Sequence, residues 1–282
     1  MRTFHLFVTM LSASLLAGCA GSGQRPQAMP VARVIHAPAA TLPAPSTAPF
    51  NEGPAMAHDT ILTRLEQAAP EADPGVLALA LEARNCAVRR GDVDSAARLA
   101  VIDYSRPSTE KRLWVFDVAR GALLHREHVA HGQGSGEKFA TKFSNVEGSY
   151  QTSLGLYRTA ETYMGGNGYS LRMDGLDPGF NDNARQRAIV MHGAWYANPD
   201  LIRTQGRLGR SQGCPALREQ VARVVIDDLK QRNLLFAYAD DAAWLQRGRS
   251  FACDGRSASQ ILASARTPRT GGSSLASAVA AP

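Results

Sequence analysis

The chain has 282 residues, of which 44% are hydrophobic, and it carries a formal net charge of +6. This length allows one large domain with tails, and the charge alone would favour an anionic partner. The Arg residues, however, are scattered among acidic residues and form no stripe, which argues against a nucleic-acid-binding face. We therefore expect no nucleic-acid partner, while the sequence leaves the oligomeric state open.

The N-terminal segment is typical of an exported lipoprotein. Arg2 precedes an apolar run over residues 4–16, which is too short to span a bilayer durably and ends in Leu16-Ala17-Gly18-Cys19. This ending resembles the bacterial lipobox, which implies cleavage before Cys19 and lipidation of its thiol, with residues 1–19 as signal peptide and lipobox. Ala20 would favour the periplasmic face of the outer membrane within the cell envelope. A plain signal peptide with an incidental cysteine is the alternative.

Composition divides the rest of the chain into three parts. Residues 20–58 are rich in Pro and Ala, with Ser, Thr and Gln, and are predicted to form a disordered tether. Residues 256–282 are rich in Ser, Ala and Gly and are predicted to be a disordered tail. Residues 59–255 are long enough for one solid core and are predicted to form a single domain.

The apolar spacing within this domain predicts helices first and strands afterwards. Helical spacing covers residues 60–69 and 74–89, with a third short helix over 94–99. Strand-like runs follow at 99–104, 112–117, 123–130, 188–191 and 234–238, and a helix over 217–232 precedes the last strand. Residues 131–182 are rich in Gly, Ser and Asn, as active-site loops and hairpins often are. The predicted fold is mostly β with α (α+β): a β-rich core, an N-terminal helical cover and one late helix.

The cysteines suggest one bridge and one free thiol. The chain has four, Cys19, Cys86, Cys214 and Cys253. If lipid takes Cys19, three remain in an oxidising compartment, where they cannot all pair. Cys86 and Cys253 flank the domain, so a disulfide between them would close a long loop and leave Cys214 unpaired. The alternative is that Cys86 and Cys253 are buried thiols.

Cys214 stands in a setting that would activate a thiol. Pro215 suits the first turn of a helix, and a helical pattern begins at residue 217, so Cys214 is predicted at a helix N-cap. The helix dipole, with Arg207 and Arg210 nearby, would lower the pKa of the thiol towards neutrality. Gly209 and Gly213 would let backbone amides converge as an oxyanion hole.

His192 is the candidate base for this thiol. It ends the strand over 188–191 and is followed by Gly193, so its ring can project from the sheet edge into a cleft. A histidine in this place alone is more often structural. Combined with a Gly-rich cysteine loop that can return to it, the histidine is predicted to be functional.

These stretches resemble the L,D-transpeptidase (YkuD-type) catalytic domain, with the flanks closest to its murein L,D-transpeptidase subfamily. The likeness rests on His192-Gly193 and on the run from Gly206 to Ala216, which reads GRLGRSQGCPA, and it covers roughly residues 60–240. Further matching stretches are residues 101–105, 113–117, 130–136, 143–145, 152–156, 169–172 and 188–193. The cysteine loop is the most specific part.

The resemblance implies a β-rich fold, peptidoglycan stem peptides as substrate, and a reaction without cofactor or metal. Cys214 would attack the carbonyl of the third stem residue, usually diaminopimelate, and expel the terminal D-Ala; an amine or water would then resolve the thioester. His192 would accept the thiol proton while the carbonyl of Gly193 holds its ring. The remaining candidates are Gly213 and Gln212 as orienting or oxyanion residues, and Arg210, Arg207, Ser211 and His131 as substrate-binding residues, with a structural role equally open for His131.

Two departures from the family pattern keep other functions open. Gln212 stands where many members have His, and Ala216 stands where many have Arg or Asn, so carboxylate binding would pass to Arg210 or Arg207. The alternatives are a hydrolytic variant (an L,D-carboxypeptidase or an amidase that releases wall proteins) and a non-catalytic wall-binding lipoprotein. His125, His128 and His131 recur at every third position, which on a strand sends His128 to the opposite face and argues against a metal site.

Overall fold

The computed structural model describes residues 54–95 and 97–267, with side chains from residue 60 onward. The signal segment, Cys19, most of the predicted tether and the last part of the predicted tail lie outside the described residues. Within the described part of the chain, no helix is long and apolar enough to cross a membrane.

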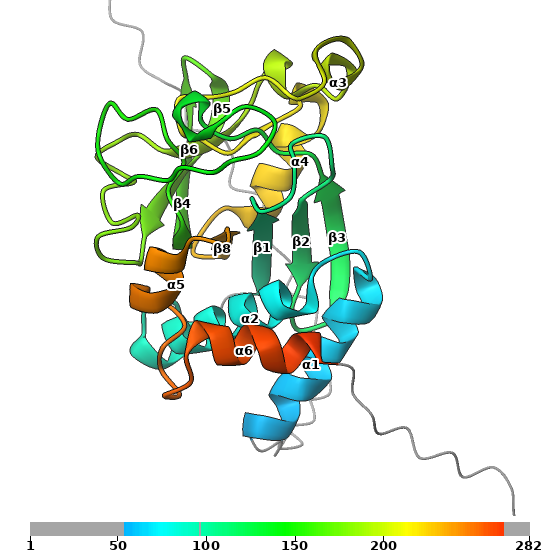
Figure 1. Cartoon of the computed structure of the whole chain (residues 1–282), viewed down its shortest axis with the longest axis vertical. Coiled ribbons are helices and arrows are strands. Elements are labelled where there is room, and N and C mark those ends of the chain that lie inside the picture. The colour runs from blue at the N-terminus through cyan, green and yellow to red at the C-terminus, as the bar shows by residue number, and fades with distance from the viewer. Residues whose placement is uncertain (1–53, 96, 268–282) are drawn as a thin grey trace, which may run out of the picture. The chain divides into compact units, whose positions relative to one another are not determined.

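Eight strands form one curved, mixed sheet (Figure 1). In chain order they are β1 (Arg98–Asp103), β2 (Leu113–Asp117), β3 (Ala122–Glu127), β4 (Gly155–Gly165), β5 (Gly168–Gly175), β6 (Val190–Gly193), β7 (Ala216–Leu217) and β8 (Leu234–Tyr238). Their order in the sheet is β3-β2-β1-β8-β4-β5-β6-β7, with β1–β8 and β6–β7 parallel and the other pairs antiparallel. Ala130, just beyond β3, bridges Ala216 in β7, so the two edges approach each other and the sheet is barrel-like.

Six α-helices accompany the sheet in the described residues: α1 (Pro54–Ala68), α2 (Pro74–Arg90), α3 (Asp200–Gln205), α4 (Glu219–Leu229), α5 (Ala242–Arg247) and α6 (Ala258–Arg266). α2 begins where the Asp73 side chain accepts a hydrogen bond from the amide of Val76 at 3.0 Å, and it ends at Gly91, whose φ of 75° suits glycine. α6 packs on α2, and α4 packs on β6 and β1. Two 3-10 turns, Gln133–Ser135 and Trp195–Ala197, lie near the sheet's upper end in Figure 1.

The predicted α+β fold with its N-terminal helical cover is confirmed. The predicted helix over 94–99 is wrong, because Leu99 belongs to β1, where the strand is buried and pairs with β2 on one side and β8 on the other. The long hairpin of β4 and β5 occupies part of the Gly-rich region that the sequence could only describe as loops and hairpins.

The start of the predicted disordered tail is also wrong. Residues 258–266 form the helix α6. Its N-terminus is capped by a capping box, in which the side chains of Ser257 and Gln260 each accept a hydrogen bond from the other residue's backbone amide. Ile261 and Leu262 are buried on the side of α6 that joins the core. α6 therefore belongs to the folded domain, and so do residues 54–58 of the predicted tether, which lie in α1.

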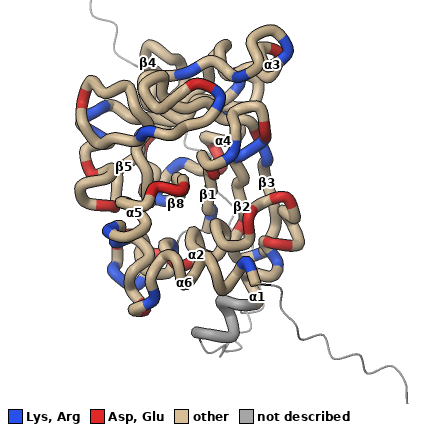
Figure 2. Tube along the Cα trace, in the orientation of Figure 1, with Lys and Arg blue, Asp and Glu red and all other residues tan. Residues whose placement is uncertain are grey.

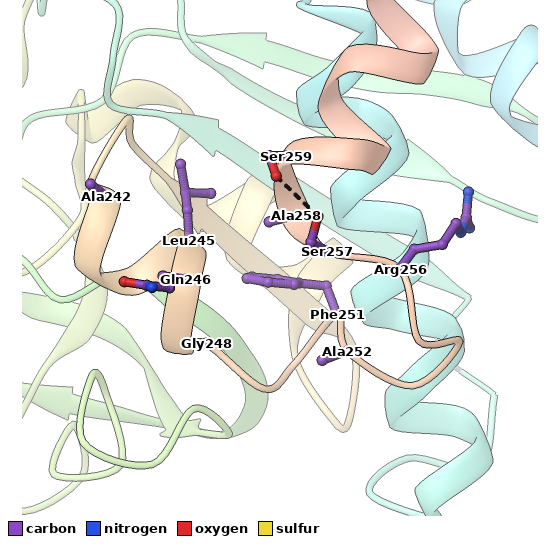
Figure 3. Close-up of a pocket in the computed structure, with 10 residues that line it drawn as sticks. All are labelled: Ala242, Leu245, Gln246, Gly248, Phe251, Ala252, Arg256, Ser257, Ala258 and Ser259. Atoms are coloured by element: carbon purple, nitrogen blue, oxygen red, sulfur yellow. Dashed lines mark hydrogen bonds between the residues drawn. The ribbon is translucent and has the colours of Figure 1, made fainter.

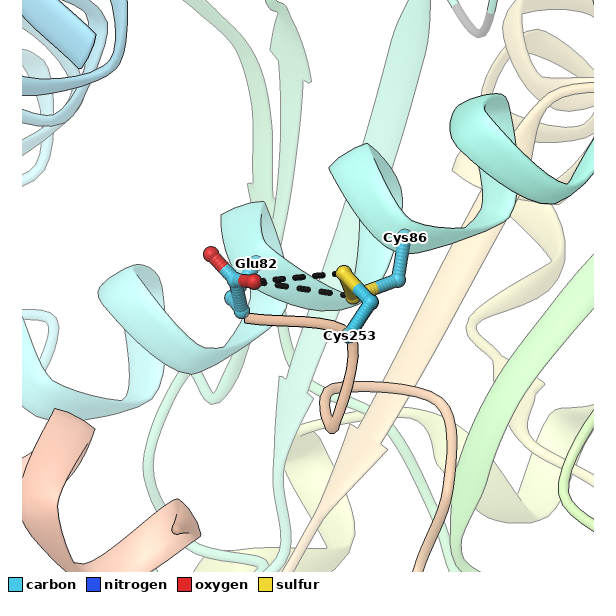
Figure 4. Close-up of side chains that lie close together, drawn as sticks. All are labelled: Glu82, Cys86 and Cys253. Carbon is cyan, nitrogen blue, oxygen red and sulfur yellow. Dashed lines mark hydrogen bonds between the residues drawn. A yellow bond between two sulfur atoms is a disulfide. The ribbon is translucent and has the colours of Figure 1, made fainter. Parts of the chain in front are cut away.

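Cys86 in α2 and Cys253 in the loop before α6 form a disulfide (Figure 4), with their Cα atoms 5.6 Å apart. This is the pairing suggested by the sequence. The Glu82 carboxylate lies 3.5 Å from the sulfur of Cys86 and 3.4 Å from that of Cys253. Among the described residues, these three side chains form the one cluster of His, Cys or acidic residues whose ligand atoms are close enough together to hold a metal ion. Because the two sulfurs are bonded to each other, we assign no metal to this cluster.

Basic and acidic residues are interspersed over the surface (Figure 2). Many Arg side chains pair with acids, as Arg185 does with Glu161 at 2.9 Å and Arg218 with Glu127 at 2.8 Å. Many of the basic side chains are thus neutralised by a local acidic partner.

Candidate active site

Cys214 lies in the loop between α3 and β7, and the prediction that it forms a helix N-cap is wrong. The chain continues after Pro215 as the short strand β7, and α4 begins only at Glu219. The reason is that Ala216 and Leu217 pair with His192 and Gly193 of β6, so the residues expected in the first helical turn are used by the sheet.

The same pairing brings the thiol beside the strand that carries His192. His192 is opposite Ala216, and Cys214, two residues before Ala216, lies next to Val190, two residues before His192. The amide of Val190 donates a hydrogen bond to the sulfur at 3.4 Å, and the sulfur lies 3.7 Å from the carbonyl oxygen of Ala188. Ala188 has a φ of 52°, a left-handed conformation that is uncommon for alanine.

Cys214 and His192 line one pocket of about 630 Å³. Its wall also includes Gln133, Glu147, Gly148, Tyr150, Tyr163, Asn167, Arg187, Ala188, Ile189, Val190, Tyr196, Arg210, Ser211 and Gln212. The two predicted reacting residues therefore face the same space.

The ring of His192 is held in a defined orientation. Its Nδ1 lies 2.9 Å from the carbonyl oxygen of Gly193; since a carbonyl can only accept, Nδ1 carries the proton and Nε2 presents a lone pair. The hydroxyl of Tyr196 lies 3.5 Å from Nε2. Burial lowers the pKa of His192 below its ordinary value of 6.5, which keeps the imidazole neutral at neutral pH. This orientation by Gly193 agrees with the role implied by the family resemblance.

The expected lowering of the Cys214 pKa is not found. Burial raises the pKa of the thiol above its ordinary value of 9.0, and the Val190 amide and the Arg187 charge only partly oppose this effect. Arg207 and Arg210, which were expected to help, instead form ion pairs with Glu137 at 2.9 Å and 2.6 Å. The resting pocket is thus lined by a neutral thiol and a neutral imidazole.

The Cys214 thiol and the His192 imidazole thus line one pocket. The family model of the L,D-transpeptidase catalytic domain matches residues 68–238. The chain belongs to the L,D-transpeptidase catalytic-domain family.

The chain also has a low similarity to several solved structures. One, an L,D-transpeptidase from Mycobacterium smegmatis, aligns with a TM-score of 0.33 and 14% identity, over 51% of this chain and 60% of that one. L,D-transpeptidase 3 from Mycobacterium tuberculosis gives 0.33 and 13%, over 51% and 62%. The helical cell shape determining protein Pgp2 from Campylobacter jejuni gives 0.33 and 13%, over 60% and 68%. The chain therefore spans about three fifths of the length of the first two, and no curated protein matches it.

In this L,D-transpeptidase domain, Ser211 supports the cysteine loop from within. It is buried, and its hydroxyl donates to the carbonyl of Cys214 at 2.6 Å and accepts from the amide of Gly213 at 3.1 Å. Thr152 donates to the carbonyl of Gly213 at 3.2 Å. The Gly213 amide, which was expected to join an oxyanion hole, is therefore engaged inside the loop, whereas Gln212 faces the pocket.

His131 lies behind the pocket wall, which corrects the expectation that it binds substrate. Its side chain is fully buried, and its Nδ1 accepts a hydrogen bond from the guanidinium of Arg112 at 2.7 Å. Burial and the charge of Arg112 lower the pKa of His131 to about 3, so it stays neutral. Its backbone carbonyl accepts from the amide of Ser211 at 2.9 Å, which makes His131 part of the support for the cysteine loop.

Arg210 and Tyr196 separate the main pocket from a smaller one of about 240 Å³ that includes Arg207 and Trp195. Arg210 lines both pockets, and its guanidinium is held by Glu137 and by the carbonyl of Gly136 at 3.1 Å. Arg207 and Arg210 each line a pocket, as expected of residues that bind a substrate carboxylate. The carboxylate of Glu137, however, already forms an ion pair with both of them.

Sequence reasoning missed Arg187 and the Val190 amide. Arg187 lines the pocket, and its charge is the cationic influence on the Cys214 thiol. Its only sequence signal was its position shortly before the strand that ends at His192. The backbone amide of Val190 gave no signal, because its contact depends on how β6 and β7 pair.

A further cavity, of about 430 Å³, lies between α5 and α6 (Figure 3). Leu245 and Phe251 form much of its wall, and the hydroxyl of Ser257, which caps α6, lies 3.0 Å from that of Ser259. Arg256 is its one charged side chain, and it contains no pair of nucleophile and base. This cavity therefore lacks a pair of groups like the thiol and imidazole that line the Cys214 pocket.

Proposed function

We propose that the chain is a cysteine-dependent L,D-transpeptidase that forms a thioester with a peptidoglycan stem peptide and passes it to an amine. The observation that carries this proposal is that the Cys214 thiol and the His192 ring, with its Nε2 lone pair, line one pocket in a domain of the L,D-transpeptidase family.

The acylation step uses both neutral groups. Nε2 of His192 takes the proton from the thiol, and the sulfur attacks the carbonyl carbon of the third stem residue. As the tetrahedral intermediate collapses, the bond to the terminal D-Ala breaks and the imidazolium gives its proton to the leaving amine. The product is a thioester on Cys214, with neutral His192 restored.

The second step reverses these roles. His192 accepts a proton from the incoming amine, which attacks the thioester carbon, and the sulfur leaves and recovers the proton. Gln212 lines the same pocket as Cys214, and we propose it as the hydrogen-bond donor to the oxyanion in both steps. Arg210 and Arg207 are our candidates for the substrate carboxylate, which would displace Glu137.

The test combines a covalent label with product analysis. The full chain is incubated with a carbapenem and digested with trypsin. The mass of the peptide Ser211–Arg218, in which Cys214 is the only cysteine, is then measured by mass spectrometry. We expect the mass of the acyl adduct in the wild-type peptide and none in Cys214→Ala. The absence of both an adduct and turnover would favour a non-catalytic wall-binding protein.

Incubation with defined muropeptides separates transfer from hydrolysis. New cross-links between two third residues would support the transpeptidase, whereas tripeptides without cross-links would support the hydrolytic variant. Both products should disappear in Cys214→Ala.

We also propose that the chain is lipid-anchored through Cys19 at the periplasmic face of the outer membrane. The support is the sequence Leu16-Ala17-Gly18-Cys19 followed by Ala20. In a fractionated cell envelope, Cys19→Ala should move from the outer membrane to the soluble fraction. Retention of this variant in the membrane would contradict the anchor.

A further inference from the structure

Arg187 occupies an unusual place beside the proposed nucleophile. Its guanidinium donates to the carbonyl oxygens of Ser144 at 2.7 Å and Gln151 at 2.8 Å, to the hydroxyl of Ser149 at 3.3 Å, and to the hydroxyl of Ser153. All four acceptors are neutral and come from the segment 144–153, part of which walls the pocket.

We propose that Arg187 supplies the fixed positive charge that stabilises the Cys214 thiolate during acyl transfer, while its hydrogen bonds hold the 144–153 segment against the pocket. This inference rests on the proposed function, because it needs Cys214 to react as a thiolate.

The charge of Arg187 is less compensated than that of the other arginines at the site. Arg207 and Arg210 share Glu137 as an ion-pair partner, and Arg185, two residues from Arg187, pairs with Glu161 and Asp174. The hydrogen bonds of Arg187 instead go to neutral groups, and Glu147 acts on it only through its charge. A partly buried guanidinium without a bound carboxylate keeps its field for nearby anions.

The resting site makes such a charge useful. Burial disfavours both the Cys214 thiolate and the His192 imidazolium, so moving the proton creates two charges in a poorly solvated pocket. Charge interactions link the Cys214 sulfur to Tyr104, Tyr196 and Arg187, and Arg187 is the cation among these three. Arg210 also lines the pocket, but its guanidinium is paired with Glu137. The presence of Arg187 lowers the pKa of the thiol and would also favour the anionic tetrahedral intermediate.

Because Arg187 also holds the pocket wall, the test must separate charge from structure. We would measure the rate of iodoacetamide alkylation against pH, read by mass spectrometry on the peptide Ser211–Arg218 of the full chain. Arg187→Gln keeps a hydrogen-bonding side chain without the charge, and Arg187→Lys keeps the charge with fewer hydrogen bonds. Arg185→Met is the matched control, since it removes a neighbouring positive charge that does not line the pocket.

In Arg187→Gln we expect the pH midpoint for alkylation to rise by about one unit, and the rate at pH 7 to fall about tenfold. Arg187→Lys should restore most of the rate, and Arg185→Met should match the wild type. An unchanged midpoint in Arg187→Gln would overturn the inference, as would a shift in Arg187→Lys as large as in Arg187→Gln.

If Arg187→Gln does not fold, Arg187→Met takes its place in the same assay: a midpoint raised by about one unit supports the charge role, and an unchanged midpoint overturns it. Failure of the proposed function is distinguishable, because the wild type would then give neither a carbapenem adduct nor turnover, or turnover would persist in Cys214→Ala, whatever the Arg187 variants do to the alkylation midpoint.

Discussion

Figure 1 places β6 and α3 toward one end of the sheet and α2 and α6 at the other. At the pocket end, which we define as β6, β7 and the 206–215 loop, hydrogen bonds hold the neutral side chains of Cys214 and His192 in place. At the disulfide end, defined as α2, α6 and the Cys86–Cys253 bridge, a covalent bond and apolar packing hold the C-terminal segment.

The family match sharpens this difference. It covers residues 68–238, so the pocket end lies within it, whereas α5, α6 and Cys253 lie beyond it. The disulfide therefore ties a segment outside the matched domain onto α2, which lies inside it. We expect changes at the pocket end to alter rates and changes at the disulfide end to alter stability.

The largest effect should come from His192→Gln, which keeps the size of the side chain but cannot take a proton from the thiol. Loss of a general base costs about 10²–10⁴-fold in rate. We expect carbapenem acylation of Cys214 to slow by this factor, measured by mass spectrometry, while the thermal midpoint of unfolding changes by only a few degrees. An unchanged acylation rate would remove His192 from the mechanism.

The double variant Cys86→Ser/Cys253→Ser tests the disulfide end, where we expect a loss of stability without a loss of rate. The bridge joins residues 167 apart in sequence, and loss of a native disulfide costs about 2–5 kcal/mol because the unfolded chain regains the freedom of the closed loop. Urea unfolding should report this loss, while the acylation rate of the folded protein at 25 °C stays at the wild-type value. If the rate fell as far as in His192→Gln, the two ends would be coupled.

A smaller effect is expected from Ser211→Ala, which removes both hydrogen bonds of a buried hydroxyl within the cysteine loop. A lost pair of this kind costs about 1–2 kcal/mol, so acylation should slow about tenfold. If Ser211 only supports the loop, kcat falls and KM is nearly unchanged; a rise in KM alone would restore its predicted role in substrate binding. Ser259→Ala, an exposed serine in α6, is the control.

The sequence was informative where chemistry is carried by residue types at short spacing. Cys214, Pro215 and the glycines before them predict a reactive loop and His192-Gly193 predicts its partner, and both residues line one pocket in the structure. The residues could not show that β7 takes the place of the first helical turn, because a two-residue strand has no periodicity and its pairing with β6 is a contact between distant segments.

The burial of individual side chains was the second property that the sequence could not predict. His131 looked like a pocket residue because it stands in a Gly- and Ser-rich loop, yet it is buried against Arg112, which precedes β2 directly. Likewise, the pKa of Cys214 is set mainly by burial, which composition does not reveal, rather than by the arginines that follow α3. α6 was missed because an Ala- and Ser-rich segment can form a helix once its apolar residues meet α2.

The smallest effect concerns Glu82, whose side chain is buried at the disulfide end beside both sulfurs. Burial, followed by the nearby Asp254, raises the pKa of Glu82 from 4.5 to about 7, although Arg89 and Arg256 act against this. The folded state thus keeps a proton that the unfolded state releases near pH 4.5. Its contribution to stability is therefore complete at acid pH and is lost as the pH rises through about 7.

Glu82→Gln cannot ionise and should escape this loss. Because the two arginines share the carboxylate charge, we expect a gain of about 1 kcal/mol at pH 8, or roughly 2–4 °C in the thermal midpoint, and almost none at pH 5. Calorimetry at both pH values, with the exposed Glu110→Gln as control, measures the difference. Since Glu82 lies at the disulfide end, acylation of Cys214 should be unaffected. An equal change at pH 5 and pH 8 would show that Glu82 does not titrate in this range.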